Sequence, residues 1–117
     1  MSNNFTGIYK EYYAEGQLKS EVFINCGKKE GLYKSYYQNG QIFYEVNYIN
    51  DKKNGIGIFY YQNGKIYCDV NYIDDKKNGI LKSYYQNGQL SSEINYINNY
   101  RYGIEKSYDP NGQLRKE

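Results

Sequence analysis

The hydrophobic and polar positions of this chain repeat along its whole length. Runs such as residues 32–37 and 41–49 are rich in Tyr, Ile and Val, and clusters of Asn and Gly separate them. Short runs of aromatic and β-branched residues bounded by Asn and Gly are typical of β-strands joined by tight turns. The pattern therefore predicts pairs of short strands and does not favour helices.

Two series of glycines give the period of this repeat. The first series is Gly7, Gly31, Gly55, Gly79 and Gly103, and the second is Gly16, Gly40, Gly64, Gly88 and Gly112. Within each series the spacing is always 24 residues. We therefore expect a single repeat domain over residues 1–117, with full repeats at 7–30, 31–54, 55–78 and 79–102 and a partial fifth repeat at 103–117. In such arrays, each repeat contacts mainly its neighbours.

The first turn of each repeat is best defined by its last copy, residues 109–112, which has the sequence Asp-Pro-Asn-Gly. Proline early in the turn and glycine at its end favour a type I turn closed by a left-handed glycine, which leaves a three-residue loop. In the second repeat, this turn pairs Tyr37 with Gln41 and Tyr36 with Ile42.

Strict alternation from this pairing sorts the side chains onto two faces of a sheet. The expected apolar face carries Leu32, Lys34, Tyr36, Ile42, Tyr44, Val46 and Tyr48, with Ile80, Tyr84, Leu90, Ile94 and Tyr96 as equivalents. The expected polar face carries Tyr33, Ser35, Tyr37, Phe43, Glu45 and Asn47, with Tyr61, Tyr67, Asp69 and Tyr85 as equivalents. An aromatic stripe is therefore expected along the polar face.

The second connection of each repeat, such as residues 50–54, is short and polar. A short connection returns the chain to an adjacent antiparallel strand, because parallel strands need a longer crossover. The expected fold is all-β, an antiparallel meander of about nine or ten strands in one elongated, twisted sheet. Because the edges of such a sheet are open, a structural role as a self-associating homo-oligomer is one alternative function.

The repeat unit resembles a known family. Its pattern is G-x-x-x-x-Y-Y-x-N-G-x-[LI]-x-x-E-x-x-Y, and the matching residues of the second repeat include Tyr36, Tyr37, Gly40, Glu45 and Tyr48. This pattern is similar to the variant MORN repeat found in the YwqK family of bacterial antitoxins. The resemblance implies a β-hairpin array that binds proteins, with antitoxin or immunity roles for bacterial members and lipid binding in the broader MORN group.

The composition argues against several kinds of catalytic and metal-binding site. The chain has no His, so it lacks the commonest general base, the Ser-His-Asp and Cys-His arrangements and most zinc sites. One carboxylate recurs in each full repeat, at Glu21, Glu45, Asp69 and Glu93. We expect these groups to pair with cations such as Lys34 or to be solvated. The protein is therefore not expected to be an enzyme, and no catalytic residue, cofactor or metal is expected.

The tyrosines are the main candidates for function. The chain has 18 Tyr and 4 Phe but no Trp, and Tyr is enriched at protein interfaces because it combines a large rigid ring with a polar tip. The expected partner-binding residues are Tyr9, Tyr13, Tyr33, Tyr37, Phe43, Tyr61, Tyr67 and Tyr85. Through them the protein would neutralise a partner sterically, as an antitoxin, an immunity protein or an inhibitor of a toxin, nuclease or defence effector, phage-borne inhibitors included. Alternatively, the rings stack on one another to shield a sheet that has no second layer.

A cationic edge gives another alternative function. Its residues are Lys28, Lys29, Lys52, Lys53, Lys76, Lys77 and Arg101. A regular cationic row beside exposed tyrosines is one way to bind single-stranded nucleic acid, and anionic lipid is a second ligand of this kind. Asp51, Asp74 and Asp75 lie among the lysines and the net charge is only +2, so much of the field is cancelled.

The cysteines and the first residues of the chain bear on disulfide formation and cellular location. Cys26 and Cys68 occupy non-equivalent positions of the repeat, so no disulfide framework is expected; Cys68 is expected in the core and Cys26 in an exposed turn. The first residues lack the charged and apolar regions of a secretion signal, and no apolar run approaches the roughly 20 residues of a membrane span. The expected location is the cytoplasm.

Overall fold

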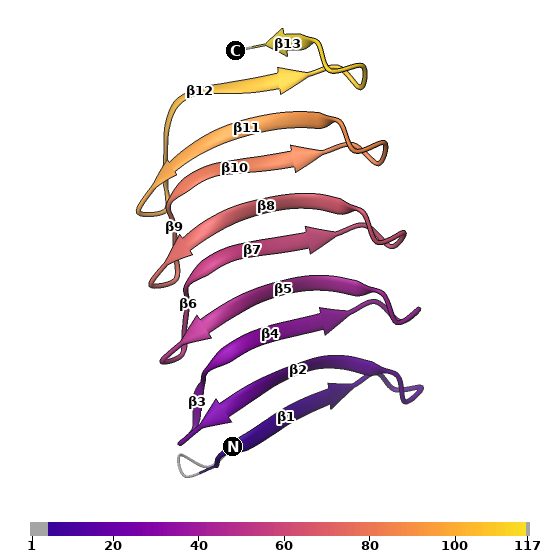
Figure 1. Ribbon diagram of the computed structural model, residues 1–117, viewed down its shortest axis with the longest axis vertical. Coiled ribbons are helices and arrows are strands. Elements are labelled where there is room, and N and C mark those ends of the chain that lie inside the picture. The colour runs from indigo at the N-terminus through magenta and orange to yellow at the C-terminus, as the bar shows by residue number, and fades with distance from the viewer. Residues whose placement is uncertain (1–4, 117) are drawn as a thin grey trace.

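The chain folds into a single open β-sheet (Figure 1). The computed structural model describes residues 5–116, which form thirteen strands and no helix. The long strands are β1 (Gly7–Tyr12), β2 (Leu18–Asn25), β4 (Gly31–Tyr36), β5 (Ile42–Ile49), β7 (Gly55–Tyr60), β8 (Ile66–Ile73), β10 (Gly79–Tyr84), β11 (Leu90–Ile97) and β12 (Tyr100–Tyr108). The shorter strands are β3 (Lys28–Lys29), β6 (Lys52–Lys53), β9 (Lys76–Lys77) and β13 (Leu114–Lys116).

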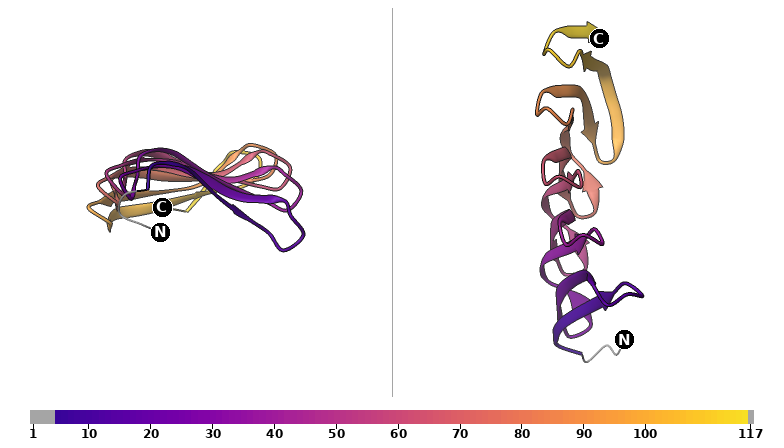
Figure 2. Two further views of the ribbon diagram at one scale, coloured as in Figure 1. Left: turned by 90° about the horizontal axis from the view of Figure 1, so that it is seen from below. Right: turned by 90° about the vertical axis from the view of Figure 1, so that its right-hand side faces the viewer.

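Consecutive hairpins stack in sequence order along one axis. The strand order is β1-β2-β4-β5-β7-β8-β10-β11-β12-β13, and β3, β6 and β9 each pair with the end of the strand that precedes them. The described residues span 50 × 33 × 17 Å, so they form one elongated layer, and Figure 2 shows the twist of this layer. The predicted antiparallel meander in a single twisted sheet is confirmed.

The three-residue turns line up on the right-hand edge of the sheet in Figure 1. In the second repeat, the Tyr37 N–H donates to the Gln41 carbonyl at 2.8 Å, and the Gly40 N–H donates to the Tyr37 carbonyl at 3.0 Å. Gly40 has a φ of 89°, a left-handed conformation that glycine adopts without steric cost. This is the turn that Pro110 predicts, and the pairing of Tyr37 with Gln41 is confirmed.

The second connections form the left-hand edge and contain tight two-residue turns. Asn50 and Asp51 have φ values of 53° and 74°. Two successive left-handed residues are typical of the type I′ turn, whose twist matches that of a β-hairpin. The turn closes a short hairpin between β5 and β6, and the chain then continues into β7, which pairs antiparallel with β5 as expected.

A β-bulge in each long hairpin contradicts part of the predicted face assignment. Tyr36 pairs with Ile42 as predicted, but Ser35 pairs with Tyr44, so Phe43 is an extra residue on its strand. One inserted residue exchanges the faces of all side chains beyond it. The sequence shows no break in its alternation at this point, and the prediction was wrong for that reason.

The two faces of the sheet therefore differ in composition from the prediction. We call one face the packed face; in the second repeat it carries Tyr33, Ser35, Tyr44, Val46 and Tyr48. The open face carries Leu32, Lys34, Tyr36, Ile42, Glu45 and Asn47, and Ile80 and Tyr84 lie on it as equivalents. Residues that strict alternation separates thus share a face, and the aromatic side chains of both strands can pack together.

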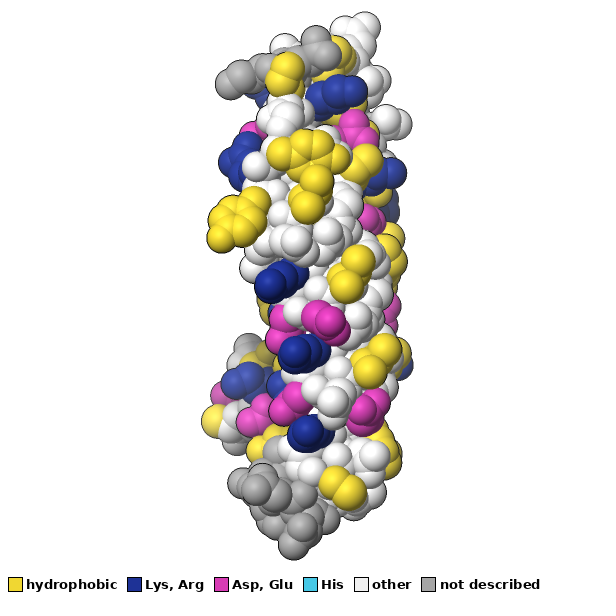
Figure 3. All heavy atoms as spheres, turned by 90° about the vertical axis from the view of Figure 1, so that its left-hand side faces the viewer, with side chains coloured by type: hydrophobic (Ala, Val, Ile, Leu, Met, Phe, Trp, Pro, Cys, Tyr) yellow, Lys and Arg dark blue, Asp and Glu magenta, His cyan; other side chains and the backbone are white. Residues whose placement is uncertain are grey.

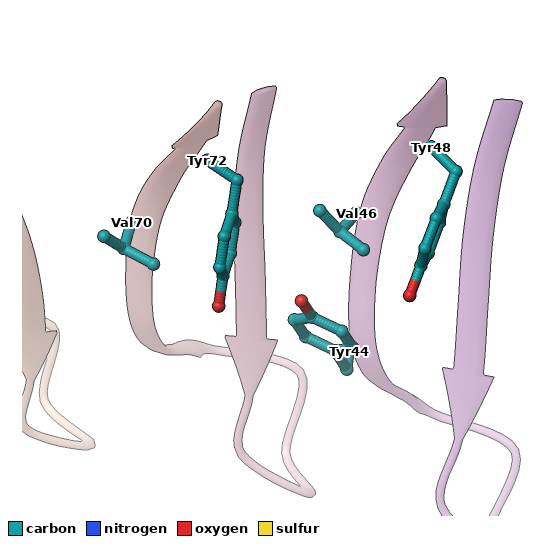
Figure 4. Close-up of a cluster of buried hydrophobic side chains, with 5 residues drawn as sticks. All are labelled: Tyr44, Val46, Tyr48, Val70 and Tyr72. Carbon is teal, nitrogen blue, oxygen red and sulfur yellow. The ribbon is translucent and has the colours of Figure 1, made fainter. Parts of the chain in front are cut away.

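A cluster of buried hydrophobic side chains lies on the packed face of the middle repeats (Figure 4). Its members are Tyr44, Val46, Tyr48, Val70 and Tyr72, and Val22 and Ile24 are buried in the first repeat. A Cβ atom on Gly57 would lie 2.9 Å from the Tyr72 ring and 3.2 Å from the Tyr44 hydroxyl, so only glycine leaves room for both rings. Tyrosine rings that lie over neighbouring strands thus cover the sheet in place of a second layer.

Candidate functional site

Tyrosine hydroxyls join each repeat to the next at the right-hand edge. The second tyrosine of each Tyr-Tyr pair donates to a backbone carbonyl one repeat later, and Tyr37 reaches the Tyr60 carbonyl at 2.6 Å. The same bond joins Tyr13 to Tyr36, Tyr61 to Tyr84 and Tyr85 to Tyr108. Several tyrosines that the sequence predicts to bind a partner therefore use their hydroxyls within the fold.

From the second repeat onward, the tyrosine that ends the first long strand of a repeat binds an acidic side chain of the preceding repeat. Tyr36 donates to Glu21 Oε2 and Tyr60 donates to Glu45 Oε1, both at 2.6 Å. Equivalent bonds join Tyr84 to Asp69 at 3.4 Å and Tyr108 to Glu93 at 2.7 Å. Burial, with a smaller effect of the carboxylate, raises the pKa of Tyr36 to about 12 and that of Tyr60 to about 12.

The sequence predicts lysines as the partners of these carboxylates, but the structure also places tyrosine hydroxyls beside them. Lys34 does lie opposite both Glu21 and Glu45 in the sheet register. The tyrosine hydroxyls are the hydrogen-bond donors, and strict alternation wrongly places them on the other face. A constant separation of 15 residues between carboxylate and tyrosine is the signal that was present in the sequence.

A groove lined by aromatic rings lies near the right-hand edge, in the second and third repeats. The rings of this aromatic groove belong to Tyr37, Phe43, Phe59, Tyr61 and Tyr67, with Tyr60 as a further lining residue. The groove has a volume of about 360 Å³ and an almost wholly apolar lining. Edge-to-face contacts hold its rings, with centroids 5.1 Å apart for Tyr37 and Phe43 and 5.1 Å apart for Tyr61 and Tyr67.

The β-bulges place two of these rings at the surface. Phe43 and Tyr67 are the extra residues of the bulges in β5 and β8. A bulge redirects a side chain, and bulges are frequent beside functional sites. Phe43 is 40% exposed and Tyr67 is 48% exposed. Because Lys19 and Ser91 hold this position in the first and fourth repeats, the aromatic groove is confined to the middle of the array.

Other predicted partner-binding residues lie elsewhere on the sheet. The Tyr33 ring belongs to the core, with its centroid 6.3 Å from that of Tyr44 and 6.0 Å from that of Tyr48. Tyr9, its equivalent in the first repeat, lies opposite Val22 and is 39% exposed. The remaining two, one repeat before and one repeat after the groove, are Tyr13 and Tyr85.

Phe59 and Tyr60 line the groove but were not among the predicted partner-binding residues. The Phe59 ring stacks on the buried Tyr44 ring at a centroid distance of 4.1 Å and lies 5.7 Å from the Phe43 ring. The equivalent residues of the neighbouring repeats are Ser35 and Ser83. An aromatic residue at a position that is serine in the two neighbouring repeats was the available signal.

The left-hand edge carries the predicted cations, and Figure 3 shows them in a row with acidic side chains among them. The second lysine of each pair lies over a tyrosine ring, with Nζ to centroid distances of 4.9 Å for Lys29 and Tyr48, 5.0 Å for Lys53 and Tyr72 and 4.9 Å for Lys77 and Tyr96. Arg101 forms an ion pair with Glu105 at 3.0 Å. The exposed lysines of this edge are Lys28, Lys52 and Lys76.

The acidic residues between these lysines have a structural role. The Asp51 N–H donates to the Lys29 carbonyl at 2.9 Å, and Asp51 Oδ1 accepts the Lys29 N–H at 3.0 Å. Asp75 makes the same two bonds with Lys53, at 2.9 and 2.8 Å. These two aspartates therefore bond their turns to the preceding repeat and also reduce the local positive charge.

Residues 5–116 were also compared with the requirements of a metal site, a reactive thiol and a membrane-spanning helix. Within this range, no group of three or more His, Cys, Asp or Glu residues is placed to hold a metal ion. Cys68 is half-buried opposite Phe59, and burial raises the pKa of its thiol, whereas Cys26 is exposed in a turn, as predicted. The same residues contain no helix long and apolar enough to cross a membrane.

Comparison with known protein families gives a match along the whole array. A family model described as "MORN repeat variant" matches residues 5–25, 29–50, 53–74, 77–98 and 101–117. Successive matched segments begin 24 residues apart, in agreement with the glycine series. No curated protein matches the chain.

Proposed function

We propose, because the chain belongs to the MORN repeat variant family, that it is a non-catalytic module that binds a partner protein and neutralises it by steric blocking. It would act in the manner of the YwqK-type antitoxins that its repeats resemble, or as an immunity protein or an inhibitor of a toxin, nuclease or defence effector, including a phage-borne inhibitor. The observation that carries this proposal is the exposed aromatic groove in the middle of the array.

The groove suits protein recognition because two of its rings are exposed and its rings are also rigid. The Tyr37 and Tyr61 hydroxyls are bonded to backbone carbonyls, and ring contacts hold Phe43 and Tyr67 in place. Rigid aromatic side chains lose little conformational entropy on binding and often dominate the binding energy of an interface. A standard interface of about 800 Å² per partner would extend from the groove over roughly three repeats.

The test replaces the two bulge residues with the residue of another repeat. Serine occupies this position as Ser91, so we expect the double variant Phe43→Ser, Tyr67→Ser to fold. The full chain and the variant are used to capture proteins from the native host, with quantification by mass spectrometry. We expect the variant to lose the specific partner by about tenfold or more, as for a hot spot. The purified partner should be inhibited by the unmodified chain and not by the variant.

Phe23→Ser is the matched control. Phe23 is 42% exposed, much like Phe43, but lies on the open face opposite Ile8. This control should retain the partner. Equal capture by all three proteins, or loss of the partner only in Phe23→Ser, would reject the aromatic groove as the binding surface.

The left-hand edge supports a second candidate function, the binding of nucleic acid or anionic lipid. The supporting observation is one exposed lysine in each of the first three repeats, at Lys28, Lys52 and Lys76. The cations engaged with rings or with Glu105 weaken this candidate. This second candidate predicts that single-stranded DNA or anionic vesicles bind the chain with an affinity that falls steeply as the salt concentration rises.

Self-association through the open sheet edges is a third candidate function. Light scattering of the purified chain tests it.

A further inference from the structure

We infer that the aromatic groove binds a proline-rich segment of the partner in the polyproline II conformation. This inference rests on the proposed function and names the part of the partner that contacts the groove. It is based on the spacing of the groove walls, on the chemistry of the lining and on a cation beyond one end of the groove.

The walls of the groove are two equivalent ring pairs. Tyr37 packs against Phe43 at an interplanar angle of 68°, and Tyr61 packs against Tyr67 at 65°. The pairs lie one repeat apart, which is two strands or about 9–10 Å. A polyproline II helix has three residues per turn and rises about 3.1 Å per residue, so it repeats every ~9.3 Å. Residues i and i+3 of such a segment would therefore meet equivalent walls.

Other regular ligand conformations do not match this spacing. An extended strand returns to the same face every two residues, or about 6.6–6.8 Å. One turn of an α-helix advances about 5.4 Å. Among these conformations, only the polyproline II helix places a side chain on each wall after one turn.

The lining of the groove favours proline over a polar ligand. Phe43 and Phe59 carry no polar side-chain atom, and the Tyr37 and Tyr61 hydroxyls already donate to carbonyls at 2.6 Å. Within residues 5–116 the Tyr67 hydroxyl makes no hydrogen bond, so it is available to a ligand carbonyl. Aromatic grooves of this kind recognise the preformed polyproline II helix. Stacked nucleotides are less well suited, because the groove has no cation in its lining to meet phosphates.

One end of the groove points toward a positive charge. In the first repeat, the bulge position is held by Lys19, whose Nζ lies 5.8 Å from the centre of the Tyr13 ring. The same position one repeat beyond the other end is held by the uncharged Ser91. A ligand with an acidic residue three positions from its first bound proline would place that residue at Lys19. The charge difference between the two ends would also set the direction of the ligand.

The experiment measures peptide binding to the full chain by fluorescence anisotropy. The probe is a labelled oligoproline of about eight residues, ~25 Å long, with one terminal glutamate. A peptide of the same length with glycine in place of most prolines is the flexible control. We expect saturable binding of the oligoproline, with affinity lower by about tenfold or more for the glycine peptide and for the Phe43→Ser, Tyr67→Ser variant. Phe23→Ser should bind normally.

The terminal charge provides a second readout. Replacing the peptide glutamate by glutamine should weaken binding about threefold, as expected for an exposed ion pair. In Lys19→Ser the two peptides should bind equally, because this variant has the residue of the fourth repeat at that position. No preference for glutamate in the unmodified chain would overturn the assignment of Lys19.

Three results would overturn the inference as a whole. They are no binding of the oligoproline, equal binding of the glycine peptide, and preferential binding of oligothymidine with a steep salt dependence. If the peptide fails but the groove variant still loses its captured partner, the proposed function stands and the proline-rich ligand is rejected. If the groove variant keeps the partner, the aromatic groove is rejected as the binding surface, and the proline-rich ligand is rejected with it.

Discussion

The two edges of the sheet join one hairpin to the next with different residues. At the right-hand edge, the hydroxyl of Tyr37 crosses to the Tyr60 carbonyl of the following repeat. At the left-hand edge, Asp51 in a two-residue turn exchanges two hydrogen bonds with the Lys29 backbone. Both arrangements recur along the array, as they must where each repeat contacts mainly its neighbours.

The difference shows why the proposed binding surface lies on the right. The left-hand turn is narrow, and its lysines Lys29 and Lys53 are held over tyrosine rings. The right-hand edge combines a wider turn with a bulge. The bulge leaves Phe43 and Tyr67 exposed, and neither side chain is used in the hydrogen bonds between repeats. The Phe43 and Tyr67 rings remain exposed at this edge because its bonds between repeats use tyrosine hydroxyls and amides of the turns.

The largest expected effect on the right-hand edge is its sensitivity to alkaline pH. The pKa of Tyr36 and that of Tyr60 are each raised from 10.0 to about 12 in the fold. Below pH 10 both states keep these protons and the stabilisation is complete. Between pH 10 and about 12 the unfolded chain loses the protons first, so the free energy of unfolding falls as pH rises. Thermal unfolding followed by circular dichroism at stepped pH measures the loss.

A variant with Tyr36→Phe and Tyr60→Phe isolates this effect from the titration of lysines. It should be less stable at neutral pH because it lacks two hydrogen bonds to carboxylates, and its melting temperature should depend less on pH above 10. An identical alkaline slope in the variant and the unmodified chain would show that these tyrosines do not control it.

A smaller loss is expected when a single ring is removed from the right-hand edge. Tyr37→Ala removes the ring that packs on Phe43 and the bond to the Tyr60 carbonyl, and we expect a cost of about 2–3 kcal/mol in the free energy of unfolding. Tyr37→Phe keeps the ring and should cost about 1 kcal/mol. Urea unfolding measures the loss in the free energy of unfolding for each variant. Equal losses would mean that the hydroxyl, and not the ring, holds this edge.

The smallest effect is expected at the left-hand edge. Asp75→Ala removes the acceptor of the Lys53 N–H and places alanine at a φ of 73°, with an expected cost of about 1–2 kcal/mol. Asp75→Asn is the matched control, because Asn99 makes the equivalent bond to Lys77, and it should be nearly neutral. If Asp75→Asn loses as much as Asp75→Ala, charge and not the hydrogen bond stabilises this turn.

The parts of the fold that the sequence predicted are local ones. Pro110 and the glycine series predict the turn, and the turn gives the pairing of Tyr37 with Gln41. The side-chain faces were wrong beyond Phe43, because a bulge adds one residue without any change in the residue types around it. Four residues of the aromatic groove were among the predicted set, but they were assigned to an assumed polar face, and Phe59 and Tyr60 were absent from that set.

The sequence by itself determined the period, the antiparallel hairpins and the right-hand turn, because each depends on residues within a few positions of one another. Only the tertiary structure decided which side chains meet. The hydroxyl bonds link residues 23 or 15 positions apart, as for Tyr37 with Tyr60 and Tyr36 with Glu21, and they form only when one hairpin is stacked on the next. The groove follows from the same stacking, since its two walls belong to successive repeats.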